Sequence, residues 1–398
     1  MDCYETKETM ETKIGRDTVV VVDLDAIAHN VREFRRHLGP DVKIMAVVKA
    51  NAYGHGAVQV AKTALEAGAE YLAVAFEDEG IELRRAGIEA PVLVLGLTPD
   101  HAVAEALKAG LTLTVYHHES LQTIEREAAR LGIRARVHVK LDTGMGRLGL
   151  FPDEAVAFVK RALELKSVEV EGIFTHYATS DQADKEYALY QERRFAEVLN
   201  RLEKEGISIP LPHIANSGGA IDLSDHAYRM ARVGISLYGY YPSDQVNRTA
   251  VNLRPALTLK TRIADLKQPP AGTGVSYGKT YISDGDEWIA AVPVGYADGV
   301  NRHLSNRGFA LVRGRRVPIV GRVCMDQLML NVTNAMPVEI GDEVVLYGEQ
   351  YGECITVDEV AKLLGTISYE VVSTLSHRIP RVYRKEGEVV EIVNRLRF

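Results

Sequence analysis

A regular alternation of short apolar runs and amphipathic stretches, from Lys43 to about Gly239, constrains the fold of this chain more than any other feature. The apolar runs are predicted β-strands, at residues 43–49, 71–76, 91–95, 111–115, 135–141, 168–175, 211–215 and 230–234. They are continuous in their apolar character, which is typical of parallel strands covered on both faces. Eight such strands, each followed by a helix or helical turn, predict an α/β fold, namely a (β/α)8 or TIM barrel. An open doubly wound sheet shares the local pattern, but the number of strands and the position of the polar residues favour the barrel.

The character of the sequence changes after about Arg254, where Gly, Pro and Asp pairs typical of turns separate short strand-like runs. Predicted strands lie at residues 288–292, 310–312, 317–320, 327–332 and 343–347, with helices near 357–364 and 369–375. We therefore expect a barrel over residues 17–254, followed by a mainly antiparallel β domain over residues 255–398. Residues 18–22 form a further predicted strand that joins either the barrel or the C-terminal sheet, and residues 1–16 are expected to be a disordered lead-in.

Composition and charge exclude several classes of protein. The chain has 398 residues, of which 46% are hydrophobic and 25% charged, which is enough for a large core and two domains. The formal net charge is −7 and no basic stripe occurs, so nucleic acid is not an expected partner. No apolar stretch approaches the ~18 residues needed to span a bilayer, and the N-terminus lacks an apolar signal core. We therefore expect a cytoplasmic protein without membrane contact. Neither the histidines nor the three cysteines have the spacing of metal ligands, so no metal site is expected.

Lys49 is the first residue with a chemical implication. It follows the apolar run of residues 44–48 and precedes a turn that contains Gly54 and Gly56. A lysine whose stem lies in an apolar wall has a depressed pKa, which makes its amine a usable nucleophile or base. Such an amine suits a Schiff base with a carbonyl cofactor, of which pyridoxal 5′-phosphate (PLP) is the commonest, and Tyr53 is near enough in sequence to reach the phosphate. The alternative is a strand-terminal lysine whose ammonium group reaches water.

Polar side chains also stand at the ends of several other predicted strands, where the working residues of a barrel lie. They are Lys140, Asp142 and Arg147 after the fifth strand, His176 after the sixth, Asn216 and Ser217 after the seventh, and Arg232 and Gly234 at the eighth. Each alone has an ordinary explanation, such as a helix cap, a buried hydrogen bond or an ion pair. Their shared position at one end of the barrel predicts a common site.

The last two loops at this end predict a phosphate site. Barrels often bind phosphate through backbone N–H groups of the loops after strands seven and eight. Here those loops read Asn216-Ser217-Gly218-Gly219 and Arg232-Val233-Gly234-Ile235. The glycines allow a close approach of the backbone, and Ser217 adds a hydroxyl donor.

Five segments in both halves of the chain resemble alanine racemase. They are VVKANAYGHG at residues 47–56, KLDTGMGR at 140–147, GVSYG at 274–278, VGYADG at 294–299 and GRVCMDQ at 321–327. The resemblance extends from about Asp17 to Arg384 without a departure at the motif positions. It implies a PLP-dependent isomerase of fold type III that interconverts L- and D-alanine. It also implies a head-to-tail homodimer whose active sites take residues from both subunits, and a role in supplying D-alanine for peptidoglycan.

The resemblance further implies a role for each site residue. Lys49 would carry PLP as a Schiff base and serve as one catalytic base, and Tyr277 of the partner subunit would be the second. The cofactor phosphate would be bound by Tyr53, Ser217, Gly234, Ile235 and Tyr369. Arg232 would face the pyridine nitrogen with support from His176, and Asn216 would complete the cofactor site.

The same resemblance implies how the substrate is bound. The alanine carboxylate would meet Arg147 and the backbone of Met325, while Tyr296 and Asp326 would line the access path. In this family the residue that matches Lys140 can be carbamylated, which would give an anion that orients Arg147. The alternative is an ordinary lysine beside Asp142.

The reaction explains why these residue types are needed. Racemisation removes the α-proton from one face and returns a proton to the other, so two opposed bases serve it most simply. Lysine and tyrosine ordinarily have pKa values of about 10, so each pKa must be lowered, by desolvation for Lys49 and by positive charge for Tyr277. Arg232 can only donate hydrogen bonds, so it would leave the ring nitrogen unprotonated and limit a transamination side reaction. Sequence alone places Tyr277 either in the site or on an exposed loop.

Three other functions stay open at this point. A PLP-dependent decarboxylase has the same two-domain architecture, but such enzymes bring a carboxylate to the pyridine nitrogen, where this chain has Arg232. A PLP carrier built on a bare barrel would not need the large C-terminal domain. A broader racemase would also accept serine. Tyr296 and Tyr369 predict a tight pocket that favours alanine, although one extra hydroxyl is hard for such a pocket to reject.

Overall fold

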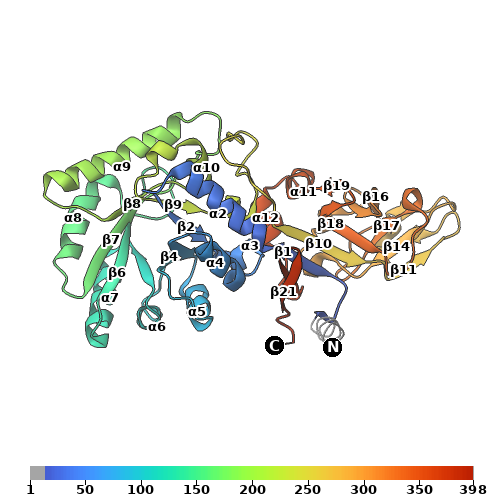
Figure 1. Ribbon diagram of the computed structural model, residues 1–398, viewed down its shortest axis with the longest axis horizontal. Helices are drawn as coiled ribbons and strands as arrows, with labels where there is room; N and C mark the ends of the chain where they lie inside the picture. The colour runs from blue at the N-terminus through green and yellow to red at the C-terminus, as the bar shows by residue number, and fades with distance from the viewer. Residues whose placement is uncertain (1–13, 398) are drawn as a thin grey trace. The chain divides into compact units, whose positions relative to one another are not determined.

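The computed structural model describes residues 14–397, so most of the expected lead-in (residues 1–13) lies outside the described residues. The described chain forms two compact units. The first contains residues 26–52 and 57–255, and the second contains residues 14–25, 53–56 and 256–397. Figure 1 shows strands surrounded by helices in the first unit and a broad sheet in the second.

The first unit is an α/β barrel. Its parallel strands are β2 (Lys43–Val47), β3 (Tyr71–Val74), β4 (Val92–Leu97), β5 (Thr112–Val115), β6 (Ala135–Lys140), β7 (Val168–Phe174), β8 (Leu211–His213) and β9 (Met230–Val233). They are paired in the order β8-β7-β6-β5-β4-β3-β2-β9. Backbone hydrogen bonds from Arg229 N to Pro212 O (3.1 Å) and from Arg232 N to Ala215 O (3.0 Å) link the two ends of this order. The predicted strands are all present, and the (β/α)8 prediction is confirmed.

Helices precede or connect these strands (Figure 1). They are α2 (Leu24–Leu38), α4 (Ala57–Glu66), α5 (Glu77–Arg85), α6 (Val103–Lys108), α7 (His118–Leu131), α8 (Pro152–Leu163), α9 (Glu186–Lys204) and α10 (Ser217–Asp222), with the 3₁₀ turns η1 (Ser224–His226) and η2 (Ile235–Tyr238). Helix α7 is typical, since it buries Leu121, Ile124 and Ala128 and ends at Gly132, whose φ of 67° favours glycine. Helix α6 has only six residues, which are too few turns to show a helical periodicity of their own.

The end of β2 differs from the prediction. The strand ends at Val47, and the chain then forms α3 (Lys49–Tyr53), so Lys49 lies beyond the strand and not within it. Ala50, Asn51 and Ala52 have φ values of 52°, 53° and 52°, so this turn is left-handed. A left-handed conformation costs about 1–2 kcal/mol for each residue with a side chain, so contacts with other parts of the chain must hold the turn.

The second unit is built on an 11-stranded, mainly antiparallel sheet. In sheet order its strands are β11 (Asp265–Lys267), β14 (Ile289–Val292), β17 (Leu328–Asn331), β16 (Arg315–Val320), β15 (Phe309–Val312), β18 (Glu343–Gln350), β10 (Leu257–Arg262), β1 (Val19–Asp23), β20 (Arg381–Lys385) and β21 (Glu388–Val393), with β19 (Glu353–Ile355) beside β18. Strand β1 pairs antiparallel with β10 and parallel with β20. The strand near the N-terminus is therefore part of this sheet and not of the barrel.

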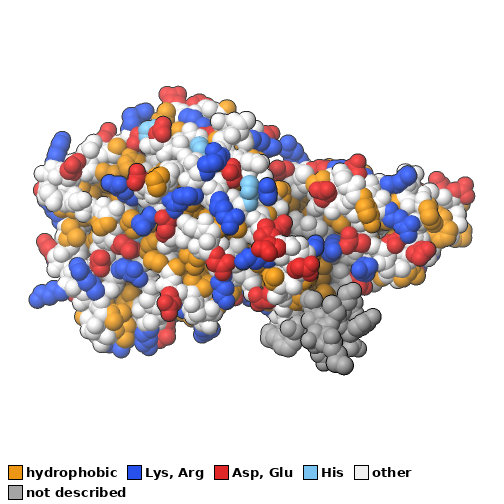
Figure 2. Space-filling view, in the orientation of Figure 1, with side chains coloured by type: hydrophobic (Ala, Val, Ile, Leu, Met, Phe, Trp, Pro, Cys, Tyr) orange, Lys and Arg blue, Asp and Glu red, His pale blue; other side chains and the backbone are white. Residues whose placement is uncertain are grey.

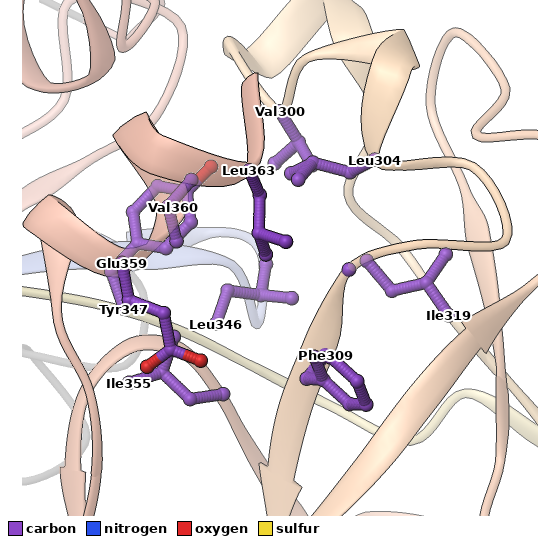
Figure 3. A pocket seen from close by; sticks show the side chains of 11 residues that line it. Val300, Leu304, Phe309, Ile319, Leu346, Tyr347, Ile355, Glu359, Val360 and Leu363 are labelled. Atoms are coloured by element: carbon purple, nitrogen blue, oxygen red, sulfur yellow. The ribbon is translucent and has the colours of Figure 1, made fainter. Parts of the chain in front are cut away.

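Short elements complete the second unit. They are the hairpin of β12 (Gly274–Val275) and β13 (Tyr281–Ile282), the 3₁₀ turns η3 (Tyr277–Lys279), η4 (Tyr296–Asp298), η5 (Arg302–Leu304) and η6 (Thr333–Ala335), and the helices α11 (Val357–Leu364) and α12 (Ser368–Ser373). The hydroxyl of Thr356 caps the start of α11, and Gly365 ends it with a φ of 70°. Figure 3 shows Val360 and Leu363 of α11 facing Leu346 of β18 across a small apolar pocket, which forms part of the core of this unit.

The surface charge, the helix composition and the placement of possible metal ligands are relevant to the expected partners. On the face shown in Figure 2, lysine and arginine side chains alternate with aspartate and glutamate and form no continuous basic stripe. Among residues 14–397, no helix is both long enough and apolar enough to cross a membrane. The same residues contain no group of three or more His, Cys, Asp or Glu side chains placed to hold a metal ion.

Candidate functional site

Lys49 begins the left-handed turn α3 at the carboxyl end of β2. Glu79 of α5 holds this turn, since its Oε1 accepts from Ala50 N at 2.5 Å and its Oε2 accepts from Ala75 N at 2.7 Å. Ala75 follows β3, the strand paired with β2. One carboxylate therefore joins the ends of two neighbouring strands and fixes the backbone that carries Lys49.

The surroundings of Lys49 favour the neutral form of its amine. The side chain is half-buried. Burial and the positive charge of Arg147 lower the pKa of Lys49, while the charge of Glu79 acts in the opposite direction. A lowered pKa increases the fraction of neutral amine near neutral pH, and the neutral amine is the form that attacks a carbonyl or accepts a proton.

Asp142 shapes the loop after β6. Its carboxylate accepts from the backbone nitrogens of Gly144 (2.9 Å), Met145 (2.8 Å), Gly146 (3.1 Å) and Arg147 (3.1 Å). Burial acts to raise the pKa of Asp142, but these N–H donors outweigh it, so the pKa lies below its usual value. The carboxylate thus stays ionised and holds the backbone of Arg147 at the carboxyl end of the barrel.

Lys140, the last residue of β6, is buried. Its Nζ donates to Leu141 O at 2.6 Å and lies 5.3 Å from the centre of the Phe174 ring. Burial and the charge of Arg232 lower the pKa of Lys140 to about 7, against the effect of Asp142. A substantial fraction of this amine is therefore neutral near neutral pH.

Arg232, on β9, is buried and held by four acceptors. Its Nη1 donates to His213 Nδ1 at 2.7 Å, and its Nη2 lies 2.8 Å from Thr175 O, 2.8 Å from Ile214 O and 3.2 Å from His176 Nδ1. Burial and the charge of Arg147 lower the pKa of Arg232 to about 9. Burial and the charge of Arg232 in turn lower the pKa of His176, so this imidazole is neutral and accepts.

The two glycine-containing loops come together. Ser217 Oγ accepts from Gly234 N at 2.9 Å, which joins the start of α10 to the loop before η2. Asn216 Oδ1 accepts from Gly219 N at 2.9 Å and caps α10. A Cβ at Gly219 would lie 2.8 Å from the ring of Tyr177, so the close packing of this loop requires glycine.

Four cationic side chains thus act on one another at the carboxyl end of the barrel: Lys49, Lys140, Arg147 and Arg232. Asp142 and Glu79 are the carboxylates that counter them. This excess of positive charge fits anionic ligands, and a lysine of lowered pKa fits one that carries an aldehyde. The donor set therefore fits PLP, which has a phosphate and an aldehyde, together with a substrate that has a carboxylate.

The second unit carries the other predicted residues. The rings of Tyr53 and Tyr369 lie 6.1 Å apart. Next to Tyr53, Gly54 O accepts from Arg381 Nε at 3.1 Å, and a Cβ at Gly54 would lie 2.2 Å from Val372 O. The segment of residues 53–56 is thus tightly fixed against the C-terminal sheet and α12, which keeps the two tyrosines close.

Tyr277, Tyr296, Met325 and Asp326 lie on loops that contact one another. Ser276 Oγ donates to Arg322 O at 2.6 Å, and this ties the turn that carries Tyr277 to the loop that carries Met325. Tyr296 N donates to Cys324 O at 2.9 Å, next to Met325. The side chains of Tyr277 and Met325 remain exposed, at 71% and 52% of their full area.

The carboxylate of Asp298 holds the loops that carry Tyr296 and Asp326. It is fully buried and accepts from Arg16 Nη1 and from Arg378 Nε, both at 2.8 Å. Arg378 Nη2 also donates to Asp326 Oδ1 at 2.7 Å. Burial acts to raise the pKa of Asp298, but the two arginines outweigh it and lower the pKa. A buried ionised carboxylate therefore fixes Asp326 and the η4 turn that begins at Tyr296.

Sequence reasoning missed three residues that organise the site: Glu79, His213 and Asp298. Their partners are far away in sequence, at Ala50, Arg232 and Arg16. A signal was available for Asp298, which lies in the motif VGYADG, and for His213, which lies in a predicted strand. Nothing local distinguishes Glu79 from the other acidic residues of its helix.

Comparison with known proteins gives one consistent result. Residues 22–242 match the family model of the alanine racemase N-terminal domain, and residues 256–383 match that of the alanine racemase C-terminal domain. Alanine racemase 2 of Caldanaerobacter subterraneus subsp. tengcongensis is 51% identical over 384 residues, which are 96% of this chain and 99% of that protein.

Solved structures agree with this match. The alanine racemase of Clostridium difficile 630 is 42% identical, with a TM-score of 0.92 over 96% of this chain and 99% of that one. The alanine racemase from Bacillus anthracis with bound L-Ala-P is 43% identical, with a TM-score of 0.90 over 96% of this chain and 98% of that one. The family resemblance found in the sequence is confirmed.

Proposed function

We propose that this chain, which belongs to the alanine racemase family of isomerases, interconverts L- and D-alanine with PLP held at Lys49. The observation that carries the proposal is the group of three basic side chains, Lys140, Arg147 and Arg232, that share the carboxyl end of the barrel with Lys49, a lysine of lowered pKa. When bound, PLP would withdraw electrons from the substrate and make its α-proton acidic.

The residues of the barrel then take distinct tasks. Lys49 would move the proton on one face of the substrate, since its surroundings favour the neutral amine. Arg232 would donate to the pyridine nitrogen, and Arg147 would bind the alanine carboxylate. The phosphate would be bound by Ser217, Gly234, Ile235, Tyr53 and Tyr369. Asn216 would cap the helix that begins at Ser217, and His176 would accept from Arg232.

The second proton would be moved by Tyr277 of the partner subunit. The side chain of Tyr277 is 71% exposed on its own chain and has no role in the core of its unit. The turn that carries Tyr277 is hydrogen-bonded to the loop that carries Met325 and Asp326, and the same loop is hydrogen-bonded to Tyr296. We infer that this exposed group completes the active site of a second copy, so the enzyme is a homodimer with shared active sites.

We also propose that Lys140 is carbamylated, which its surroundings support. The neutral amine of Lys140 would add to CO₂, forming an N–C bond and releasing one proton, to give a carbamate anion. Arg232 and Arg147, whose charges lower the pKa of this lysine, would stabilise that anion. The carbamate would then orient Arg147 toward the substrate.

The physiological role proposed here is the supply of D-alanine for peptidoglycan in the cytoplasm. A decarboxylase is less consistent with the chain, because Arg232 occupies the position at which those enzymes place a carboxylate. Alanine is the proposed main substrate, with slow turnover of serine, because a tight pocket rejects a hydroxyl only weakly.

The test is chiral analysis of L-alanine incubated with the full chain and PLP. We expect D-alanine to form until both isomers are equal in amount, and borohydride to trap PLP on Lys49. The variant Lys49→Ala should lose both results, whereas Lys62→Ala, at an exposed lysine of α4, should keep both. Release of CO₂, or D-alanine formation by Lys49→Ala, would contradict the proposal.

A further inference from the structure

A continuous series of hydrogen-bonded side chains leads from Arg232 through two buried histidines to a partly buried glutamate. Arg232 Nη1 lies 2.7 Å from His213 Nδ1, and His213 Nε2 lies 2.9 Å from His138 Nδ1. His138 Nε2 then lies 3.1 Å from Glu171 Oε2. The two histidines are fully buried, and they come from β8 and β6, while Glu171 comes from β7.

Arg232 and Glu171, at the two ends of this series, require the same proton positions on His213 and His138. A guanidinium can only donate, so His213 Nδ1 must accept and its proton must sit on Nε2. That N–H donates to His138 Nδ1, which places the proton of His138 on Nε2 as well. A carboxylate can only accept, so Glu171 requires a proton at the same position of His138. Both imidazoles are therefore neutral, and their dipoles point the same way.

The same series of side chains also provides a negative charge for Arg232. Within residues 14–397, the acceptors that hold Arg232 are backbone carbonyls and imidazoles, and no carboxylate contacts it directly. A buried guanidinium without compensation is costly. Glu171 is the first carboxylate that its hydrogen-bonded partners reach, and Tyr71 Oη also donates to Glu171 Oε2 at 2.7 Å.

We propose that His213, His138 and Glu171 are positioning residues that fix the orientation of Arg232 and supply its counter-charge through two imidazoles. The packing supports this role, because Phe174 stacks on His213 with ring centres 4.8 Å apart and parallel planes. The inference rests on the proposed function in one respect, since it assumes that Arg232 meets the pyridine nitrogen. It adds that the Glu171 carboxylate, which is linked to Arg232 through His213 and His138, controls the contact between Arg232 and the pyridine nitrogen.

The direct test is ¹⁵N NMR of the full chain labelled in histidine, first without PLP. We expect His138 and His213 to be neutral and protonated on Nε2. An imidazolium at either position, or a proton on Nδ1 of His213, would overturn the proposal. This measurement needs no activity, so it stands even if the wild-type chain fails to racemise alanine, which would instead refute the proposed function.

The second test removes the charge of Glu171. In Glu171→Gln with PLP, we expect kcat for alanine to fall about 10–100-fold, as loss of the partner behind a liganding group typically costs. KM should change less, and pyruvate from transamination should rise per turnover, because Arg232 no longer holds the ring nitrogen firmly. Thr114→Val is the control, since it removes a buried hydroxyl of the barrel, bonded to Val94 O, without removing a charge.

Equal kcat, KM and pyruvate yield in Glu171→Gln and Thr114→Val would overturn the proposal. If Glu171→Gln does not fold, the proton positions measured in the wild-type chain decide the matter alone.

Discussion

The left-handed turn after Lys49 makes an unusual prediction about a single substitution. Ala50 has φ 52° and ψ 49°, and its side chain is exposed, so removal of its Cβ loses no packing. A side chain in this conformation costs about 1–2 kcal/mol, and glycine avoids that cost. Glycine also makes the unfolded chain more flexible, which destabilises by about 0.5–1 kcal/mol. We therefore expect Ala50→Gly to stabilise the protein by about 0.5–1 kcal/mol.

The control is the same substitution in an ordinary helix. Ala129 is exposed in the right-handed helix α7, where Ala129→Gly should destabilise by about 0.5–1 kcal/mol. Thermal unfolding followed by circular dichroism should show the melting temperature rise by about 0.5–2 °C for Ala50→Gly and fall by a similar amount for Ala129→Gly. The comparison depends on the opposite signs of the two shifts. If both variants melt at lower temperature than the wild type, the strain assigned to the turn is not present.

Three further predictions concern the supports of the site. Glu79→Ala should destabilise the protein by about 2–3 kcal/mol in urea unfolding, because two backbone N–H donors lose a charged acceptor. Glu79→Gln should destabilise it by clearly less, because the amide oxygen can still accept. Equal losses of stability in the two variants would contradict this role of Glu79. Asp298→Asn should destabilise by about 3–5 kcal/mol at pH 7. Because the pKa of Asp298 is lowered on folding, this difference should be complete above about pH 4 and shrink as the pH falls further, and a constant difference would count against the ion cluster. ¹³C NMR with labelled bicarbonate should show a carbamate signal that weakens as the pH falls below about 7 and is absent in Lys140→Arg, whereas a signal indifferent to pH would argue against Lys140 as its source.

The barrel could be predicted because its signals are local. Each strand is a short apolar run, and the repeat of eight such runs restricts the possible folds. Strand β10 (Leu257–Arg262) escaped prediction, because its apolar and polar residues alternate over only six positions directly after the barrel. The polar residues at the strand ends were found because the barrel fold places all of them at one end.

The conformation at Lys49 could not be predicted. Ala50 and Ala52 favour the right-handed helix by intrinsic propensity, and the left-handed turn depends on Glu79, which is 29 residues away. The same holds for Asp298, whose partner Arg16 is 282 residues away. Such contacts decide how a site is held, and neither periodicity nor spacing reports them.

The central claim is that one active site combines Lys49 of one chain with Tyr277 of the other, and mixed dimers test it most directly. Lys49→Ala and Tyr277→Phe should each be inactive alone. When the two variants are mixed and allowed to exchange subunits, each heterodimer should contain one intact site, because both defects fall in the other site. We predict that racemisation returns to roughly a quarter of the wild-type rate at equal amounts of the two variants, since about half of the dimers are mixed and each has one working site. If mixed dimers form but stay inactive, Lys49 and Tyr277 do not come from different chains, and the shared active site is wrong.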